Sequence, residues 1–291
     1  MYLAGHIMPS VSVIIPTYNR APKVVRAISS VLCQTFNDYE IIVVDDGSTD
    51  STKPAIAQFD ECITYIAHSS NLGVSAARNT GIRRSSAPFI AFLDSDDYWL
   101  PKKLAAHMEF FRTHPYAQAC QTDEIWIRKG HRVNPKKKHL KPSGDIFEPS
   151  LKLCLVSPSA VMLRRSLLEE VGLFDEDLMV CEDYDLWLRI SCKYPVYLIR
   201  QQLIFKDGGR SDQLSYKHKG MDRFRIKSIV KLVKSGRLNE RQLISSLDEL
   251  ALKCRIYGNG CLKRGKLKEG SFYLRLPERI REELSLGFLN S

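Results

Sequence analysis

Short apolar segments alternate with segments of helical periodicity through the first hundred residues, and this alternation restricts the fold more than any other feature. Apolar strands are predicted over 11–16, 40–44, 63–67 and 89–93, and helices over 22–34, 50–59 and 75–84. Strands separated by helices in this way form parallel sheets with right-handed crossovers. We therefore expect an α/β fold with a Rossmann-like, mostly parallel sheet and flanking helices. No G-x-G-x-x-G follows the first strand, so a dinucleotide site of the usual kind is not expected.

Three of the predicted strands end in polar side chains. The first runs into Thr17-Tyr18-Asn19-Arg20, the second into Asp45-Asp46-Gly47-Ser48, and the fourth into Asp94-Ser95-Asp96-Asp97. The carboxyl ends of parallel strands lie along one edge of the sheet, where open α/β sheets bind ligands. Carboxylates at that edge suit a nucleotide, because they accept hydrogen bonds from a base or a ribose and hold a divalent metal that bridges a diphosphate.

Each acidic run also has a plain structural interpretation, and the residues alone leave both open. Asp45 would form an Asx turn, and Asp96 or Asp97 would cap a helix that begins near Pro101. Burying carboxylates beside an apolar strand costs several kcal/mol each unless a cation meets them. The run at 94–97 is therefore consistent with a metal site.

Two further groups are candidates for binding and catalysis. Arg78 lies near the start of a predicted helix with small neighbours, and its guanidinium suits a base edge or a phosphate. Glu182-Asp183-Tyr184-Asp185 opens a helix predicted over 182–191. Acidic residues in a first turn complement the helix dipole. The functional alternative is a general base, which has to lie within hydrogen-bond reach of the hydroxyl that it deprotonates.

The positive charge lies in the last quarter of the chain. Residues 217–291 carry 18 Lys and Arg against 8 Asp and Glu, an excess of ten that equals the net charge of +10 of the whole chain. Within it, 223–234 has the pattern of a basic amphipathic helix with one apolar face. That face either packs on the rest of the protein or lies on an anionic membrane. Helix breaks are expected at Gly236, at Gly258-Asn259-Gly260 and at Pro277.

The expected location is the cytoplasm, with peripheral contact at the inner face of the membrane through the basic tail. No apolar run approaches the ~18 residues of a membrane span, and the first residues lack the features of a signal peptide. The eight cysteines include no Cys-x-x-Cys pair. This pattern indicates reduced thiols more than a disulfide framework or a zinc site.

Taken together, these motifs closely resemble the family-2 glycosyltransferases over about residues 9–216. The resemblance implies an A-type glycosyltransferase fold that binds a nucleotide-diphosphate sugar and uses Mn²⁺ or Mg²⁺. It implies inverting transfer to a hydroxyl of a saccharide or lipid-linked acceptor, in the assembly of cell-surface polysaccharide or glycolipid. Residues 1–216 would form the catalytic domain, and 217–291 a basic, helical C-terminal extension.

The resemblance also implies roles for individual residues. Thr17 and Asp46 would contact the nucleoside, with Asp45 close by, and Arg78 would reach the base or the diphosphate. Asp94 and Asp96 would form the metal motif, which also faces the donor, with Asp96 as the direct ligand. Asp183 would be the catalytic base.

One position departs from the family pattern. Many relatives have a histidine in the loop after the catalytic helix, where it completes the metal shell, whereas the predicted loop at 206–215 carries Arg210. Arginine does not ligate a metal, but it pairs with a diphosphate. Arg210 is therefore expected to contact the donor, and the third protein ligand of the metal is open.

Two alternative functions come from other classes of protein. A metal-dependent nucleotidyltransferase also uses paired aspartates at a sheet edge. A non-catalytic basic module would bind nucleic acid through the tail, and it predicts aromatic residues interleaved with basic ones. The aromatic residues of the tail are widely spaced, so no nucleic-acid partner is expected.

Overall fold

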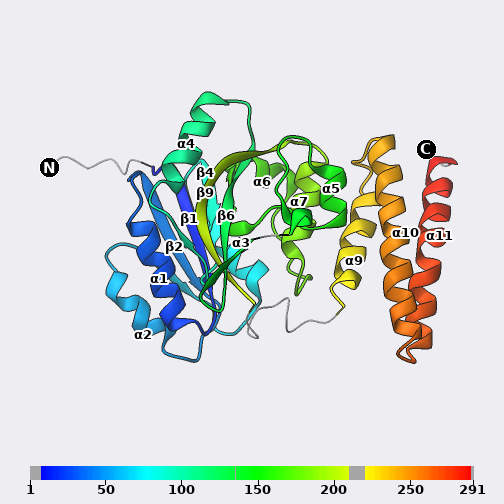
Figure 1. Ribbon diagram of the computed structural model, residues 1–291, viewed down its shortest axis with the longest axis horizontal. Coiled ribbons are helices and arrows are strands. Elements are labelled where there is room, and N and C mark those ends of the chain that lie inside the picture. The colour runs from blue at the N-terminus through cyan, green and yellow to red at the C-terminus, as the bar shows by residue number, and fades with distance from the viewer. Residues whose placement is uncertain (1–7, 135, 210–219, 290–291) are drawn as a thin grey trace.

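The computed structural model describes residues 8–134, 136–209 and 220–289 (Figure 1). The strands are β1 (Val11–Thr17), β2 (Tyr39–Asp45), β3 (Thr64–Ala67), β4 (Phe89–Phe92), β5 (Tyr98–Trp99), β6 (Ala119–Arg128), β7 (His131–Val133), β8 (Val161–Arg164) and β9 (Val196–Gly208). The helices are α1 (Ala21–Leu32), α2 (Thr52–Ile56), α3 (Val74–Arg84), α4 (Lys103–Thr113), α5 (Phe147–Lys152), α6 (Arg165–Val171), α7 (Glu182–Ser191), α9 (Asp222–Val233), α10 (Glu240–Leu262) and α11 (Leu267–Leu289).

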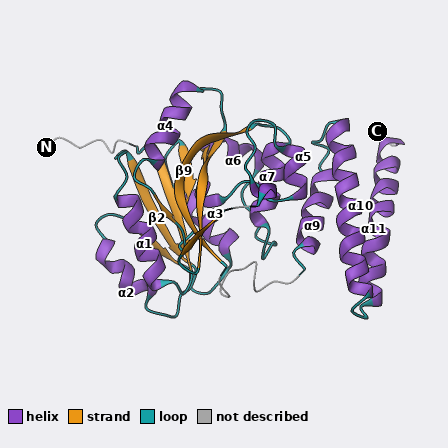
Figure 2. Ribbon diagram, viewed as in Figure 1, coloured by secondary structure: helices purple, strands orange, loops and turns teal. Residues whose placement is uncertain are grey.

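The strands form one twisted sheet with helices on both faces (Figure 2). Its order is β3-β2-β1-β4-β8-β6-β9-β5, and β7 pairs with β6 outside this path. The first four strands are parallel, as the helix–strand alternation predicts. The remainder is mixed, because β8 runs antiparallel to both β4 and β6 while β6 and β9 are parallel. An α/β sheet with flanking helices is thus confirmed.

Side chains of the central strands are buried on both faces of the sheet. In β1, Val13 contacts an apolar cluster that includes α1 and α4, whereas the next residue, Ile14, contacts a cluster with α3, α6 and α7. Buried parallel strands of this kind read as continuous apolar runs. This explains why the first four parallel strands could be predicted from their apolar runs in the sequence.

The C-terminal helices share a core with the sheet-flanking helices. Residues of α9, α10 and α11 form a third apolar cluster with α5 and α7. Ile226, Ile229 and Val233 of α9 are buried in it, so the apolar face of the segment 223–234 packs within the protein. Of the two interpretations of this face, packing is therefore the one that the structure confirms. The predicted boundary between 216 and 217 lies outside the described residues.

Two expected helix breaks were wrong. Gly258 and Gly260 lie inside α10, and Pro277 lies inside α11. A Cβ at Gly258 would come within 2.9 Å of the Leu274 side chain, so this glycine permits close approach of α11 instead of ending a helix. No described helix is both long and apolar enough to span a membrane. In addition, β9 continues to Gly208, beyond the predicted start of the loop at 206.

Lys103 of α4 is a buried lysine that contacts the residue before β8, Ala160. The Lys103 side chain is fully buried, and its Nζ lies 2.9 Å from His107 Nε2 and donates to the Ala160 carbonyl at 3.3 Å. Among the described residues no carboxylate pairs with it, and it lies over the Trp99 ring, 4.4 Å from the centroid. Burial lowers the pKa of Lys103 to about 7.

Lys103 makes the free energy of unfolding depend on pH. Its pKa is about 7 in the folded protein and roughly 10.4 in an unfolded chain, so between these values the unfolded state binds the extra proton. The contribution of Lys103 to stability therefore rises with pH across this window, by up to ~1.4 kcal/mol per pH unit. Relative to Lys103→Met, the wild type should gain stability between pH 7 and pH 10 in denaturant titrations. The same change at the exposed neighbour, Lys102→Met, should show no such trend. Parallel curves for wild type and Lys103→Met would contradict the assignment.

Candidate active site

Arg78 on α3 joins the two acidic groups that the sequence separates. Its guanidinium is buried and donates to Asp94 Oδ1 and to Glu182 Oε1, each at 2.7 Å. Asp94 follows β4 and Glu182 begins α7, so the fold brings the second acidic cluster to the carboxyl edge of the sheet. The contact of Arg78 with a base or diphosphate stays a prediction, since in the structure both terminal nitrogens bind protein carboxylates.

The run Asp94–Asp97 has a different environment at each carboxylate. Arg20 Nη1 donates to Asp96 Oδ2 at 2.5 Å. Asp97 is buried and accepts from the Ser159 hydroxyl at 2.7 Å and the Asp207 amide at 3.2 Å. Burial, with the neighbouring Asp96, raises the pKa of Asp97 well above its usual range. None of the carboxylates caps α4, which begins without a side-chain cap.

The donor atoms at this edge fit a hard divalent cation. Asp94 and Asp96 place two carboxylates at the end of one strand, and carboxylate oxygen suits Mg²⁺ and Mn²⁺. Among the described residues no three His, Cys, Asp or Glu side chains form a closed metal site. Mg²⁺ usually takes only one or two protein carboxylates and completes its shell with phosphate oxygens and water. The residues therefore fit a metal held jointly by the protein and a diphosphate.

The carboxylates after β2 shape the neighbouring loops. Asp46 accepts from the amides of Leu72 and Gly73 at 2.9 and 2.8 Å. Asp45 accepts from the Ser48 amide, three residues on, at 2.9 Å, so its carboxylate holds the turn as the structural interpretation expected, although with a longer span than an Asx turn. Between them, Gly47 has φ +75° and a Cβ there would lie 2.6 Å from the Ser70 backbone. The chain therefore needs glycine at this turn.

Thr17 lies at the end of β1, and among the described residues its hydroxyl is a buried polar group without a hydrogen-bond partner. The whole side chain is buried. Buried polar atoms are normally satisfied. The orphaned hydroxyl therefore marks a place for a ligand atom, and its predicted contact with the nucleoside stays a prediction.

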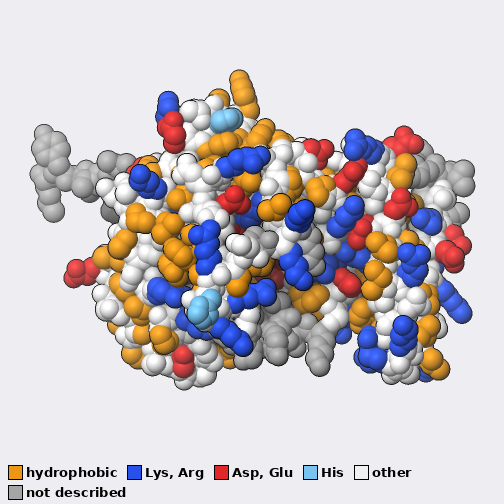
Figure 3. All heavy atoms as spheres, in the orientation of Figure 1, with side chains coloured by type: hydrophobic (Ala, Val, Ile, Leu, Met, Phe, Trp, Pro, Cys, Tyr) orange, Lys and Arg blue, Asp and Glu red, His pale blue; other side chains and the backbone are white. Residues whose placement is uncertain are grey.

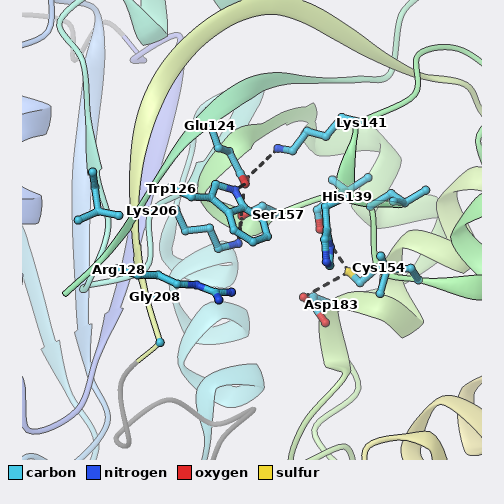
Figure 4. A pocket seen from close by; sticks show the side chains of 15 residues that line it. Glu124, Trp126, Arg128, His139, Lys141, Cys154, Ser157, Asp183, Lys206 and Gly208 are labelled. Carbon is cyan, nitrogen blue, oxygen red and sulfur yellow. Dashed lines mark hydrogen bonds and ion pairs between the residues drawn. The ribbon is translucent and has the colours of Figure 1, made fainter. Parts of the chain in front are cut away.

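Asp183 lies at the edge of a pocket (Figure 4). Its carboxylate accepts from the Tyr184 amide at 2.7 Å and from the Cys154 thiol at 3.4 Å. Cys181, two residues before Asp183, adopts the left-handed conformation with φ 63° just before α7 begins. A non-glycine residue held in this region carries backbone strain, which is often found at functional sites.

The opposite wall of the pocket is an ionic network formed by β6, β9 and the loop that precedes α5. Lys141 donates to Glu124 Oε1 at 2.9 Å, and Trp126 Nε1 donates to Glu124 Oε2 at 2.9 Å. Lys206 donates to the Ser157 hydroxyl at 2.9 Å, with its Nζ 4.0 Å from Glu124. The dashed lines of Figure 4 trace these contacts.

The charges of this network are stabilised by one another. Burial alone would raise the pKa of Glu124, but Lys141 and Lys206 lower it to about 2. Burial likewise opposes the charge on Lys206, yet Glu124, Asp97 and Asp94 together hold its pKa above the ordinary value. A permanent ammonium group therefore lies between the carboxylates of the sheet edge and Asp183.

Several of these residues were missed by sequence reasoning. Lys206 was placed in a loop, Cys154 was interpreted as a structural thiol, and Glu124 and Trp126 belong to no motif. A signal was available for Glu124 and Trp126, because they alternate with Arg128 along the sequence of β6, and side chains that alternate along a strand share one face. Arg210, the predicted donor contact, lies outside the described residues.

The chain belongs to the family described as glycosyl transferase family 2, whose sequence model matches residues 12–172. An uncharacterized glycosyltransferase of Rickettsia conorii is 35% identical over 201 residues, which cover 66% of this chain and 32% of that protein. The chain thus spans about a third of the length of this curated relative. The Escherichia coli protein UDP-Glc:alpha-D-GlcNAc-diphosphoundecaprenol beta-1,3-glucosyltransferase WfgD is 35% identical over 181 residues, covering 62% of this chain and 69% of that protein.

Solved structures confirm the fold. Staphylococcus aureus TarS in complex with UDP-GlcNAc matches with a TM-score of 0.72 and 19% identity, covering 92% of this chain and 79% of that chain. The mannosyltransferase PcManGT from Pyrobaculum calidifontis, in complex with GDP-Man and Mn2+, matches with a TM-score of 0.64 and 17% identity, covering 96% of this chain and 84% of that chain. The expected A-type glycosyltransferase fold is thereby confirmed.

Removing the Arg78 guanidinium should destabilise the protein strongly. Arg78→Gln leaves two carboxylates without their cation, and breaking a buried ion pair in this way costs about 3–5 kcal/mol. Arg83→Gln, on the same helix, removes an exposed pair with Glu176 and should cost less than about 1 kcal/mol. Denaturant unfolding of both variants measures the difference. Equal costs would show that Arg78 does not hold the two acidic groups together.

Proposed function

We propose that this protein is an inverting glycosyltransferase that moves a sugar from a nucleotide-diphosphate sugar to a hydroxyl of a saccharide or lipid-linked acceptor. The observation that carries the proposal is the bridge from Asp94 through Arg78 to Glu182, each contact 2.7 Å long. It brings Asp183, next to Glu182, to the sheet edge where the strands end in carboxylates. A donor and a proton acceptor would thus meet at one place.

Asp183 is proposed as the catalytic base. It lines the pocket, so an acceptor hydroxyl held there would transfer its proton to the carboxylate while its oxygen attacks the anomeric carbon in line. The Cys154 thiol and the Tyr184 amide hold the carboxylate in place. Glu182 would not accept the proton, since its carboxylate is hydrogen-bonded to the Arg78 guanidinium.

Asp94 and Asp96 are the residues that would hold a divalent metal, with Asp96 as the direct ligand. Mn²⁺ or Mg²⁺ there would supply Lewis-acid neutralisation of the leaving diphosphate. The Mn2+ in PcManGT and the nucleotide sugars in both solved structures support this assignment. Thr17, Asp45 and Asp46 would border the nucleoside. A lipid-diphosphate acceptor is suggested by the name of WfgD, and polysaccharide or glycolipid assembly would use such an acceptor.

The reaction is tested with nucleotide sugars and metal. Full-length protein should release a nucleoside diphosphate from at least one sugar of a panel with Mn²⁺ or Mg²⁺, and excess EDTA should stop the release reversibly. Asp183→Asn keeps the shape of the side chain but removes the proton acceptor, so turnover should fall by ~10²- to 10⁴-fold. Thermal shifts with the same nucleotide sugar should be unchanged.

The exposed variant Asp177→Asn is the matched control and should keep full turnover. Unchanged turnover in Asp183→Asn would remove Asp183 from the mechanism. Release of pyrophosphate from a nucleoside triphosphate and a sugar phosphate, with no activity on nucleotide sugars, would instead favour the nucleotidyltransferase alternative.

A peripheral membrane contact at the inner face of the cytoplasmic membrane is also proposed, at a place other than α9. Lys231 of α9 pairs with Asp175 and Asp185, so α9 faces the protein. The turn between α10 and α11 instead carries four exposed basic residues around an exposed leucine. This hairpin tip consists of Lys263, Arg264, Gly265, Lys266, Leu267 and Lys268.

The position and composition of the hairpin tip support this contact. In Figure 1 the tip lies on the lower side of the molecule, the side where β1 and β2 end. Lys and Arg side chains gather there in Figure 3, and Leu267 is 66% exposed. Anionic lipids attract such clusters by ~1 kcal/mol per basic residue. A lipid-linked acceptor would then lie on the same side as the active site.

Vesicle co-sedimentation tests the hairpin tip. The protein should bind anionic vesicles more than neutral ones, and ~1 M salt should abolish binding because the screening length falls to ~3 Å. Replacing the four basic residues of the tip by glutamine should weaken binding at least tenfold. Replacing Lys53, Arg84, Lys102 and Arg112 removes the same charge elsewhere and should have a much smaller effect. Equal losses of vesicle binding in the two variants would show that net charge, and not the hairpin tip, accounts for the binding.

A further inference from the structure

The pocket beside Asp183 is separate from the carboxylates assigned to the donor. It has a volume of about 280 Å³, close to the lower end of small-molecule sites at ~300 Å³. Asp183, Trp126 and Arg128 line it, whereas Asp94 and Asp96 do not. The molecule that meets Asp183 from this side would be the acceptor. The inference below therefore rests on the proposed function.

Trp126 gives the pocket a fixed apolar wall. Glu124 accepts from the indole nitrogen and from Lys141, and Glu124 and Lys141 are both almost fully buried. The indole is thus anchored through its polar atom while its ring lines the pocket. A large, rigid aromatic face of this kind suits the apolar C–H face of a sugar ring.

Arg128 adds a cation that no described carboxylate neutralises. It lies two residues beyond Trp126 on β6, with its guanidinium 5.9 Å from the centroid of the Trp126 ring. Its aliphatic stem lies beside Gly209, where a Cβ would be 3.5 Å from Cδ. Figure 4 shows it reaching into the pocket from the side opposite Cys154. Within the described part of the chain, no carboxylate forms an ion pair with Arg128.

The two lysines that line the pocket, Lys141 and Lys206, already have protein partners. Arg128 is therefore the cation of the pocket that is available to bind an anion. Glu124 is matched by Lys141 at 2.9 Å. Lys206 is directed to Ser157 and Glu124. A guanidinium adds little to the binding free energy of a neutral sugar. With an oxyanion it forms a charge-assisted, bidentate pair, which stabilises the bound state.

We propose that this pocket binds an acceptor sugar that carries an oxyanion, a phosphate or a carboxylate, with the ring against Trp126 and the oxyanion paired with Arg128. The recognised chemistry is the same for a glycosyl phosphate and for a uronic acid. Arg128 is thus a specificity-determining residue on the acceptor side of the reaction.

Ligand-observed NMR with the full chain tests the proposal. Three probes are compared: N-acetylglucosamine 1-phosphate, the methyl glycoside of glucuronic acid, and the neutral methyl glucoside. The protein is first saturated with the nucleoside diphosphate and metal selected by the donor panel, so that an oxyanion does not occupy the donor site. At least one oxyanion probe should bind tenfold or more tightly than the neutral glycoside.

Arg128→Gln should abolish this preference, whereas Arg132→Gln should keep it. Arg132 is the matched control because it lies on the adjacent strand β7, is exposed, and donates to Gln202 instead of lining the pocket. Preference for the phosphate alone identifies a glycosyl phosphate acceptor, and preference for the uronate alone identifies a uronic acid. Equal binding of all three probes, no binding of either oxyanion probe, or a preference that survives in Arg128→Gln would overturn the proposal.

Failure of this proposal is distinguishable from failure of the proposed function. If the nucleoside diphosphate binds but the oxyanion preference is absent, only the assignment of the pocket is lost. If no nucleoside diphosphate or nucleotide sugar binds, the glycosyltransferase activity itself is contradicted. Circular dichroism of Arg128→Gln and Arg132→Gln verifies that both variants are folded.

Discussion

The buried guanidinium of Arg78 is the interaction on which the rest of the site depends. It binds Glu182, 104 residues away along the chain, and Asp94 at the end of β4. A charge in the protein interior is tolerated only where partners meet it with good geometry, so α7 can take only a narrow range of positions against the sheet. Asp183 is fixed as a consequence, because it follows Glu182 directly. The distance between the proposed donor edge and Asp183, the proposed catalytic base, is therefore determined by one side chain.

The segment between α5 and β8 completes this constraint. Ser159 donates to Asp97 and accepts from the Asp94 amide. Within a few residues the same segment supplies Ser157 to Lys206 and Cys154 to Asp183. Side chains of one short segment thus contact the run Asp94–Asp97, the Lys206 ammonium group and Asp183. A shift of this segment would therefore disturb all three contacts together.

What the sequence could predict was local. The parallel strands and their acidic ends follow from apolar runs and from the rule that ligands bind at the carboxyl edge. The pairing of Arg78 with Glu182 could not be predicted, because it depends on tertiary contacts across 104 residues. Tertiary packing also overrode the local rule at Gly258, where glycine permits two helices to approach. Cys154 shows the same limit, since a thiol near a carboxylate has no signature in a linear pattern.

The polar side chains in the two halves of the sheet make different kinds of contact. In the parallel half, Asp45 and Asp46 hold their own loops through backbone amides, so a substitution there disturbs the backbone as well as the proposed contact with the nucleoside. In the mixed half, the pocket is lined by alternate side chains of β6, and Arg128 at its end makes no hydrogen bond that the fold requires. If the pocket binds the acceptor as proposed, a substitution of Arg128 would change the charge of the acceptor site while leaving the proposed donor edge intact. Glu124 on the same face is held by its buried ion pair with Lys141, so Arg128 is a position at which the proposed acceptor specificity can change at a lower cost in stability than at Glu124.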